Sequence, residues 1–270
     1  MPESAAIDPN YPPLTIDLLA EQFAACGLKA GDHVIVHTSL SALGWVVGGA
    51  VAVIEALMRV VTEDGTIVMP TFTNDNSDPE YWSNPPVPLA WWNIIREHMP
   101  PFDPDHTPTR EVGVVPETFR RWRGALRSRH PQVSFAAWGR FAQFIVENHT
   151  LEYPLGEGSP LARLYDLDGS ILLIGVGHQR NTSLHLAEYR ATWPSRRIMN
   201  QSFAMRVDGV RQWVTYEDVD FSAGDFGDLG ADYERETGFV PGKVGKAEVR
   251  LMRQRPIIDY AAGWMAQHRA

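Results

Sequence analysis

Two ionisable side chains three residues apart, His185 and Glu188, form the pair best placed for chemistry in this sequence. The pattern over residues 172–189 predicts a buried strand, a turn and a helix that starts among three residues suited to helix N-caps, Asn181, Thr182 and Ser183. The spacing places both side chains on one helix face. The imidazole can then act as a base that the carboxylate orients and, once protonated, stabilises. On this motif alone, a surface His–Glu pair without function is an equally good interpretation.

A second candidate site follows the predicted strand 32–37. The loop 38–49 is rich in hydroxyl groups and glycine, and a helix is predicted at 50–61. Free backbone N–H groups at such a helix start favour an anion, and glycine lets the ligand approach the backbone. Gly44, Gly48 and Gly49 do not have the Rossmann spacing, and no Gly-Lys-Ser or Gly-Lys-Thr follows. A tight strand-to-helix turn without a ligand explains the loop equally well.

Two further groups of polar residues extend this picture. Thr71 and Thr73 follow the predicted strand 66–69, and we expect them at the same sheet edge as the first loop, because strand ends of α/β folds collect active sites. Thr109 and Arg110 precede a helix predicted at 111–122, which is again an arrangement that favours anions. Turn formation and ordinary surface exposure are the simpler interpretations of these residues.

The scaffold that must position these residues is predicted to be α/β. The strand–helix–strand unit over 32–69 indicates a parallel, right-handed crossover within a mixed sheet flanked by helices. An antiparallel hairpin is predicted around Asp208-Gly209. The remaining predicted strands are 133–138 and 249–252, and the remaining helices are 15–26, 91–96, 142–147, 159–165, 226–236 and 256–267. We expect one domain over 1–270, with a loosely ordered arm at 1–13 and a functional long loop at 71–110.

Composition narrows the function. The net charge of −9, from 33 acidic and 24 basic residues, argues against a nucleic acid partner, which needs a basic footprint. It is compatible with a cationic substrate, or simply with solubility. The single cysteine, Cys26, excludes an intramolecular disulfide and suits a reducing cytoplasm. The sequence shows no signal peptide and no run of 18 apolar residues, so no membrane partner is expected.

Taken together, the chain strongly resembles the aminoglycoside N3-acetyltransferase family. The strings that carry the resemblance run in order along nearly the whole chain: 37–40, 43–49, 68–71, 107–110, 126–131, 155–160, 175–178, 181–189 and 242–245. The resemblance implies an α/β fold distinct from the common small N-acetyltransferase fold. It also implies transfer of the acetyl group of acetyl-coenzyme A to the 3-amino group of the deoxystreptamine ring in aminoglycoside antibiotics, without a metal. The chain departs from the family at Thr71–Asn74, where many relatives have a His-Ser-Gly-like stretch in the loop that faces the drug.

The resemblance also implies roles for residues. His185 becomes the catalytic base and Glu188 its orienting partner, while Thr71 or Thr73 polarises the thioester carbonyl. The residues implied to bind the coenzyme are His37, Thr38, Ser39, Leu40, Val46, Val47, Gly48, Gly49, Thr109, Arg110, Val112 and Gly113. Those implied to bind the cationic aminoglycoside are Asp75, Asp78, Tyr81, Trp82, Tyr189, Glu217, Asp218 and Asp225. A homodimer is compatible with this reading.

Two other functions remain open at this point. One is a coenzyme A-dependent acyltransferase acting on an amine that is not an antibiotic, and the departure at residues 71–74 keeps this alternative open. The other is a nucleotide- or coenzyme-binding module without catalytic activity.

Overall fold

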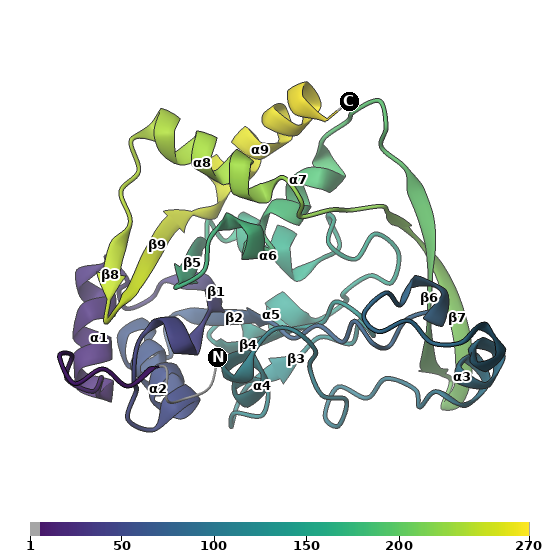
Figure 1. Ribbon diagram of the computed structural model, residues 1–270, viewed down its shortest axis with the longest axis horizontal. Helices are drawn as coiled ribbons and strands as arrows, with labels where there is room; N and C mark the ends of the chain where they lie inside the picture. Colours follow the sequence, from purple (N-terminus) through teal and green to yellow (C-terminus); the bar gives the residue numbers. More distant parts are fainter. Residues whose placement is uncertain (1–5, 270) are drawn as a thin grey trace.

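The computed structural model describes residues 6–269, and its centre is a mixed sheet with strand order β3-β4-β2-β1-β5-β9-β8 (Figure 1). The three inner strands, β2, β1 and β5, are parallel, and the strands on either side of them run antiparallel. The strand bounds are β1 His33–Thr38, β2 Thr66–Pro70, β3 Leu126–Arg127, β4 Phe135–Gly139, β5 Ser170–Ile174, β8 Gly242–Val244 and β9 Ala247–Arg253. The predicted α/β class with a mixed sheet is therefore confirmed.

Helices cover both faces of this sheet and thereby bury its inner strands on both sides. Along β1, Val34 and Val36 pack with one set of helices while Ile35 packs with the other, as strand alternation requires. The first set is α1 (Ile16–Ala25), α2 (Gly49–Val61) and α4 (Val114–Phe119). The second set is α5 (Ala142–Val146), α6 (Pro160–Asp166), α7 (Leu184–Arg190), α8 (Phe226–Thr237) and α9 (Gln254–His268).

Side-chain N-caps mark the starts of α1 and α6, whereas α4 begins later than predicted. The Thr15 hydroxyl accepts the N–H of Leu18 at the start of α1, as an N-cap should. The helix predicted from residue 111, by contrast, begins only at Val114. Glu111 has φ of 63° and Gly113 has φ of 90°, and neither value is helical. Val114, the first residue of α4, is 54% exposed.

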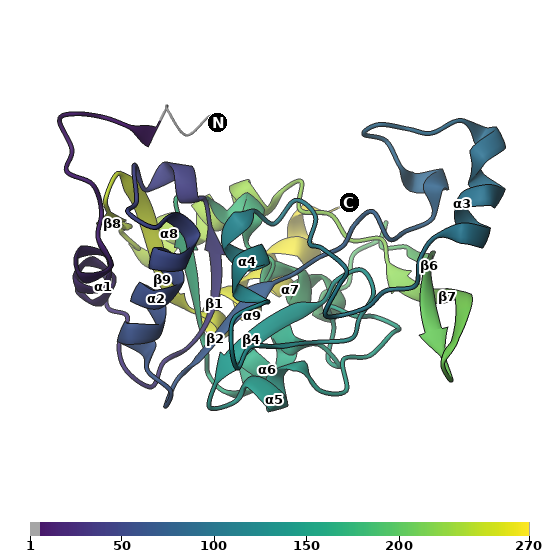
Figure 2. The same ribbon diagram turned by 90° about the horizontal axis from the view of Figure 1, so that it is seen from below.

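The predicted hairpin exists and is longer than its sequence signal. Strands β6 (Ile198–Val207) and β7 (Val210–Val219) form a separate two-stranded sheet around Asp208-Gly209. Beside it lies the long segment 71–110, which contains two 3₁₀ turns, η3 (Pro79–Tyr81) and η4 (Leu89–Trp91), and the helix α3 (Trp92–His98) (Figure 2). The Arg211 guanidinium on β7 donates to the backbone carbonyls of Met99 and Arg96, at 2.9 and 2.5 Å. The hairpin and the long segment therefore project as one unit.

The predicted arm at 1–13 lies partly outside the described residues, which begin at Ala6. In the described part, the Lys246 ammonium pairs with the Asp8 carboxylate at 2.6 Å and lies 4.6 Å from the centre of the Tyr11 ring. Leu14 forms an isolated bridge with Val46 in the loop after β1. Within residues 6–269, none of the helices has the length and apolar character needed to cross a membrane.

Candidate active site

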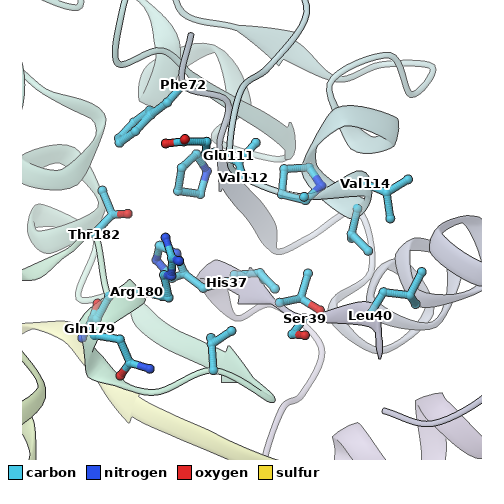
Figure 3. A pocket seen from close by; sticks show the side chains of 18 of the residues that line it. His37, Ser39, Leu40, Phe72, Glu111, Val112, Val114, Gln179, Arg180 and Thr182 are labelled. Carbon is cyan, nitrogen blue, oxygen red and sulfur yellow. The ribbon is translucent and has the colours of Figure 1, made fainter. Parts of the chain in front are cut away.

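A cavity lies where the carboxyl ends of β1, β2 and β5 meet at one edge of the sheet (Figure 3). The loop after β1 is joined to β5 by the Ser39 N–H, which donates to the Ile174 carbonyl at 2.9 Å. The cavity has a volume of about 970 Å³, and three chain segments, 36–49, 110–116 and 176–185, provide most of its wall. Strand-end convergence, expected from the sequence, thus places His37, Ser39 and Arg110 around one space.

His185 lies in the wall of this cavity, and Glu188 lies behind it. The His185 Nδ1 and the Glu188 Oε2 are 2.5 Å apart, so the three-residue spacing on α7 does bring the two groups together. Glu188 is fully buried, whereas His185 keeps 8% exposure. The rings of Phe221 and Phe226 contact the imidazole, with centroid distances of 4.8 and 4.9 Å. The imidazole is therefore held by packing on its faces and by the carboxylate on one nitrogen.

His37 is a second buried imidazole in the same cavity wall. Burial, together with a smaller effect of the charge of His185, lowers its pKa to about 3. Its Nε2 is buried and has no hydrogen-bond partner among residues 6–269. His37 therefore stays neutral near pH 7, and it adds no positive charge to the space beside His185.

The cavity also has an anion-favouring side. On this side the cavity is lined by Leu40, Val46 and Gly49, which lie between the loop after β1 and the start of α2. Arg110 and Arg180 add guanidinium groups. Both arginines are exposed, and neither takes part in an ion pair within the described part of the chain. The expected coenzyme residues that line the cavity are His37, Thr38, Ser39, Leu40, Val46, Gly49, Arg110, Val112 and Gly113.

Three residues expected at the coenzyme site do not line the cavity. Val47 points to solvent with 44% exposure. The Thr109 hydroxyl and N–H both donate to the Glu117 carboxylate at 2.8 Å, so Thr109 is held by a side chain of α4. Gly48 has φ of 84° at the N-cap of α2, and this left-handed backbone explains the glycine without a ligand.

The two threonines expected to assist catalysis also point away from the cavity. Residues 71–74 continue the extended backbone of β2, so successive side chains alternate, and Phe72 and Asn74 are the ones that reach the cavity. Thr71 and Thr73 are fully buried on the other side. The Thr71 hydroxyl lies 3.0 Å from that of Ser134, and the Thr73 hydroxyl donates to the Pro131 carbonyl. We therefore correct the prediction: neither hydroxyl lines this cavity.

Three carboxylates expected to bind the cationic substrate are already engaged within the protein. Asp78 accepts both a 2.8 and a 2.7 Å hydrogen bond from the Arg96 guanidinium. Asp225 forms a similar pair with Arg269, at 2.7 and 2.6 Å. Asp218 is 1% exposed and accepts the Tyr189 hydroxyl at 2.6 Å. Ion pairing occupies Asp78 and Asp225, and burial encloses Asp218, so contact of these three residues with a ligand stays a prediction.

The remaining predicted substrate residues lie on the projecting unit or next to it. Asp75, Tyr81 and Glu217 are exposed, and Trp82 is half-buried and donates its indole N–H to Ser77 at 2.9 Å. Tyr189 is also half-buried, and burial together with the neighbouring Asp218 raises its pKa. None of these five residues lines the cavity at the strand ends.

Several cavity residues were not anticipated from the sequence. Glu111, Gln179 and Thr182 point into the cavity with Phe72 and Arg180 (Figure 3). Gln179, Arg180 and Thr182 follow the carboxyl end of β5, and this position is the signal that would have identified them. Glu111 had no such signal, because its orientation depends on a positive φ in the turn before α4.

Burial of Asp218 predicts how stability depends on pH. Burial raises its pKa from 3.8 to about 6, although hydrogen bonds from Tyr189 and Val219 oppose the shift. Between these two values the folded state binds more protons than the unfolded state, so this group reduces the free energy of unfolding as pH rises, by up to about 3 kcal/mol. The free energy of unfolding of Asp218→Asn should therefore rise, relative to that of the unmodified protein, as the pH is raised from 4 to 7. Urea unfolding at both ends of that range measures the gain, with the exposed Asp220→Asn as control. A pH-independent difference would contradict the predicted shift.

The amino-acid sequence is similar to those of known acetyltransferases over most of its length. A sequence model of the family described as aminoglycoside 3-N-acetyltransferase matches residues 35–266. The SPbeta prophage-derived aminoglycoside N(3')-acetyltransferase-like protein YokD of Bacillus subtilis (strain 168) is 46% identical over 93% of this chain and 92% of that protein. Aminoglycoside N(3)-acetyltransferase VII of Streptomyces paromomycinus is 35% identical over 99% of this chain and 96% of that protein.

Solved structures agree with these relatives. The crystal structure of YokD from Bacillus subtilis has a TM-score of 0.93 at 44% identity and covers 95% of both chains. A structure of AAC-IIIb with CoASH has a TM-score of 0.84 at 30% identity, covering 95% of this chain and 97% of that one. AAC-VIa bound to sisomicin has a TM-score of 0.86 at 31% identity, covering 96% of this chain and 100% of that one. The resemblance seen in the sequence is therefore confirmed, and the chain belongs to the aminoglycoside 3-N-acetyltransferase family, whose members use acetyl-coenzyme A.

Proposed function

We propose that this chain transfers the acetyl group of acetyl-coenzyme A to the 3-amino group of the deoxystreptamine ring in aminoglycosides, with His185 as general base. The observation that carries the proposal is the buried Glu188 carboxylate 2.5 Å from the His185 ring, in the wall of the strand-end cavity. Family membership supports the reaction class, and this geometry supports the choice of base.

The cavity fits the coenzyme in size and in chemistry. A volume of about 970 Å³ is large enough for an extended ligand. Leu40, Val46 and Val112 offer apolar wall for a pantetheine chain, and Arg110 and Arg180 offer charge for phosphates. When bound, acetyl-coenzyme A supplies an activated acetyl thioester. AAC-IIIb, a structural neighbour, is described with CoASH, which supports a coenzyme in this fold.

The geometry of the His185–Glu188 pair indicates which imidazole nitrogen carries the hydrogen. Because Nδ1 of His185 faces the Glu188 carboxylate, that nitrogen carries the hydrogen and Nε2 keeps its lone pair. Aminoglycoside amines are largely protonated at neutral pH, so one amine must lose its proton before it can attack. Nε2 would accept that proton. The neutral amine would then form the amide bond as the carbon–sulfur bond of the thioester breaks, and the proton released from the attacking nitrogen would pass to the departing coenzyme A thiolate. Such general-base assistance is typically worth about 10²- to 10⁴-fold in rate.

The drug would lie beside the projecting unit, where Asp75 and Glu217 take part in no ion pair within residues 6–269, although Glu217 accepts the Tyr153 hydroxyl at 3.3 Å. Asp75 and Glu217 are exposed, and Glu111 stands in the cavity wall. With a net charge of −9, these groups would attract the ammonium groups of an aminoglycoside. AAC-VIa is described as bound to sisomicin, which supports this substrate class. A second copy of the chain and a cytoplasmic location remain predictions, and gel filtration would test the former.

A thiol-release assay tests the proposal directly. Acetyl-coenzyme A is offered with a panel of aminoglycosides, and the product is examined by NMR. We expect thiol release with deoxystreptamine aminoglycosides and acetylation at N3. Turnover only with other small amines would favour a different acyltransferase, and coenzyme binding without turnover would favour a silent module.

Arg110 and Arg180 predict how the coenzyme is held. Arg110→Gln and Arg180→Gln should each raise the dissociation constant of coenzyme A by about 3- to 10-fold, because each removes a charge-assisted contact of about 1 kcal/mol. Isothermal titration at low and high salt measures the effect, which should shrink at high salt because exposed charges are screened. The exposed Arg253→Gln, on β9, is the matched control. Equal affinity in all four proteins would place the phosphates elsewhere.

A further inference from the structure

Arg269, which follows α9, reaches back to the carboxylate behind His185. Its Nη1 donates to Glu188 Oε1 at 2.6 Å, and its Nε and Nη2 donate to the Asp225 carboxylate at 2.7 and 2.6 Å. Nη2 also donates to the Ser222 carbonyl at 3.0 Å. The guanidinium lies 4.9 Å from the Trp193 ring centre, and its side chain is only 12% exposed. One side chain thus joins α7, the segment before α8 and the end of α9.

Glu188 needs this partner for a physical reason. A fully buried carboxylate is costly unless a positive charge and hydrogen bonds compensate it. Its Oε2 faces His185, and its Oε1 accepts from both Arg269 and the Ser222 N–H, the latter at 2.9 Å. The planar guanidinium fork can hold two carboxylates at once, which an ammonium group does less well.

The same contacts also set the packing around the imidazole. Phe221 and Phe226 contact the His185 ring, and both lie next to residues that Arg269 holds, Ser222 and Asp225. Loss of the guanidinium would therefore free the carboxylate and loosen the aromatic wall together.

We propose that Arg269 is a positioning residue for acetyl transfer, holding the Glu188 carboxylate aimed at His185 Nδ1. The inference rests on the proposed role of His185 as base. It goes beyond that role because Arg269 does not line the cavity and its direct link to the base runs through Glu188.

Arg269→Gln is the first test, read by steady-state kinetics. We expect kcat to fall by about 10- to 100-fold, the usual cost of losing a group that orients a functional histidine. KM for both substrates and the dissociation constant of coenzyme A should change by less than about twofold, because no cavity contact is lost. Arg269→Lys should recover part of kcat. Arg190→Gln is the matched control, since Arg190 lies on α7 but pairs with Glu157.

The pH profile separates positioning from mere structural support. Without the guanidinium, the Glu188 charge is uncompensated and favours a protonated imidazole, so the acidic limb of kcat/KM should move to higher pH. The other ionisable groups that act on His185 from packed elements, His37 on β1 and Asp218 on β7, are unchanged in the variant. Arg269→Lys should leave the limb in place.

A double-mutant cycle with Glu188→Gln completes the test. If Arg269 acts through Glu188, then Arg269→Gln should cost less than about threefold further in the Glu188→Gln background. Equal losses in both backgrounds, or an unmoved pH limb, would overturn the proposal. If Arg269→Gln does not fold, Arg269→Lys and Asp225→Asn carry the same cycle. His185→Ala, assayed in parallel, tests the base itself: full activity there overturns the proposed function, whereas an inactive His185→Ala beside a normal Arg269→Gln overturns only this inference.

Discussion

His185→Ala should lower kcat by about two to four orders of magnitude while leaving coenzyme A binding nearly unchanged. The imidazole is the group in the cavity wall whose free nitrogen is set to accept a proton, because its other nitrogen faces Glu188 at 2.5 Å. His37 cannot replace it, since burial lowers the His37 pKa to about 3 and leaves a weak base. Steady-state kinetics and isothermal titration measure the two quantities.

A matched substitution controls for loss of a histidine as such. His98→Ala removes a histidine whose side chain is 70% exposed on α3, and it should be silent. Turnover within a few-fold of normal in His185→Ala would refute the assignment of the base. A parallel loss of coenzyme affinity would instead indicate a role in binding.

Glu188→Gln should cost about 10²- to 10⁴-fold in kcat, although it keeps the size of the side chain. Arg269 and the Ser222 N–H both donate to one oxygen of residue 188, so the oxygen of glutamine must stay on their side. The amide NH₂ then faces His185 Nδ1 and forces it to accept, which puts the hydrogen on Nε2. A comparable tautomer error in a catalytic triad costs about 10⁴-fold.

Stability and pH dependence distinguish this explanation from simple damage. The variant should fold, because glutamine still accepts both donors, and thermal unfolding checks that it does. Its kcat should stay low at every pH, since the wrong tautomer is not corrected by titration. Recovery of normal turnover at high pH would show that Glu188 acts only by its charge.

The main features of the scaffold could be predicted from sequence because they depend on local pattern. The runs at residues 34–36 and 171–174 are apolar throughout, which identifies inner strands buried on both faces. The ends of such parallel strands meet at one edge, which predicts that the segments following these two strands share a site. Strands β3 and β8, with two and three residues, were too short for periodicity to reveal.

Other site features depend on tertiary contacts that local pattern does not contain. Whether Thr71 or Phe72 faces the cavity depends on the register of residues 71–74 against 132–134, and a shift of one residue reverses it. Asp78 and Asp225 looked free, but their arginine partners lie 18 and 44 residues away in sequence. Arg269 approaches Glu188 across 81 residues, so no sequence motif links them.

Within the projecting unit, the β6–β7 hairpin is attached to the long segment 71–110 largely through main-chain groups. Arg211 donates to two backbone carbonyls of the long segment, and the Phe102 N–H donates to the Ala204 carbonyl at 3.0 Å. Every residue type provides a carbonyl, so side chains along residues 79–99 can be exchanged without breaking these attachments. Natural selection by a new antibiotic could therefore reshape this surface while the sheet edge and the His185–Glu188 pair stay fixed. Homologues in different bacteria are expected to diverge fastest in this unit, and swapping it between two of them should transfer the drug spectrum without changing coenzyme affinity.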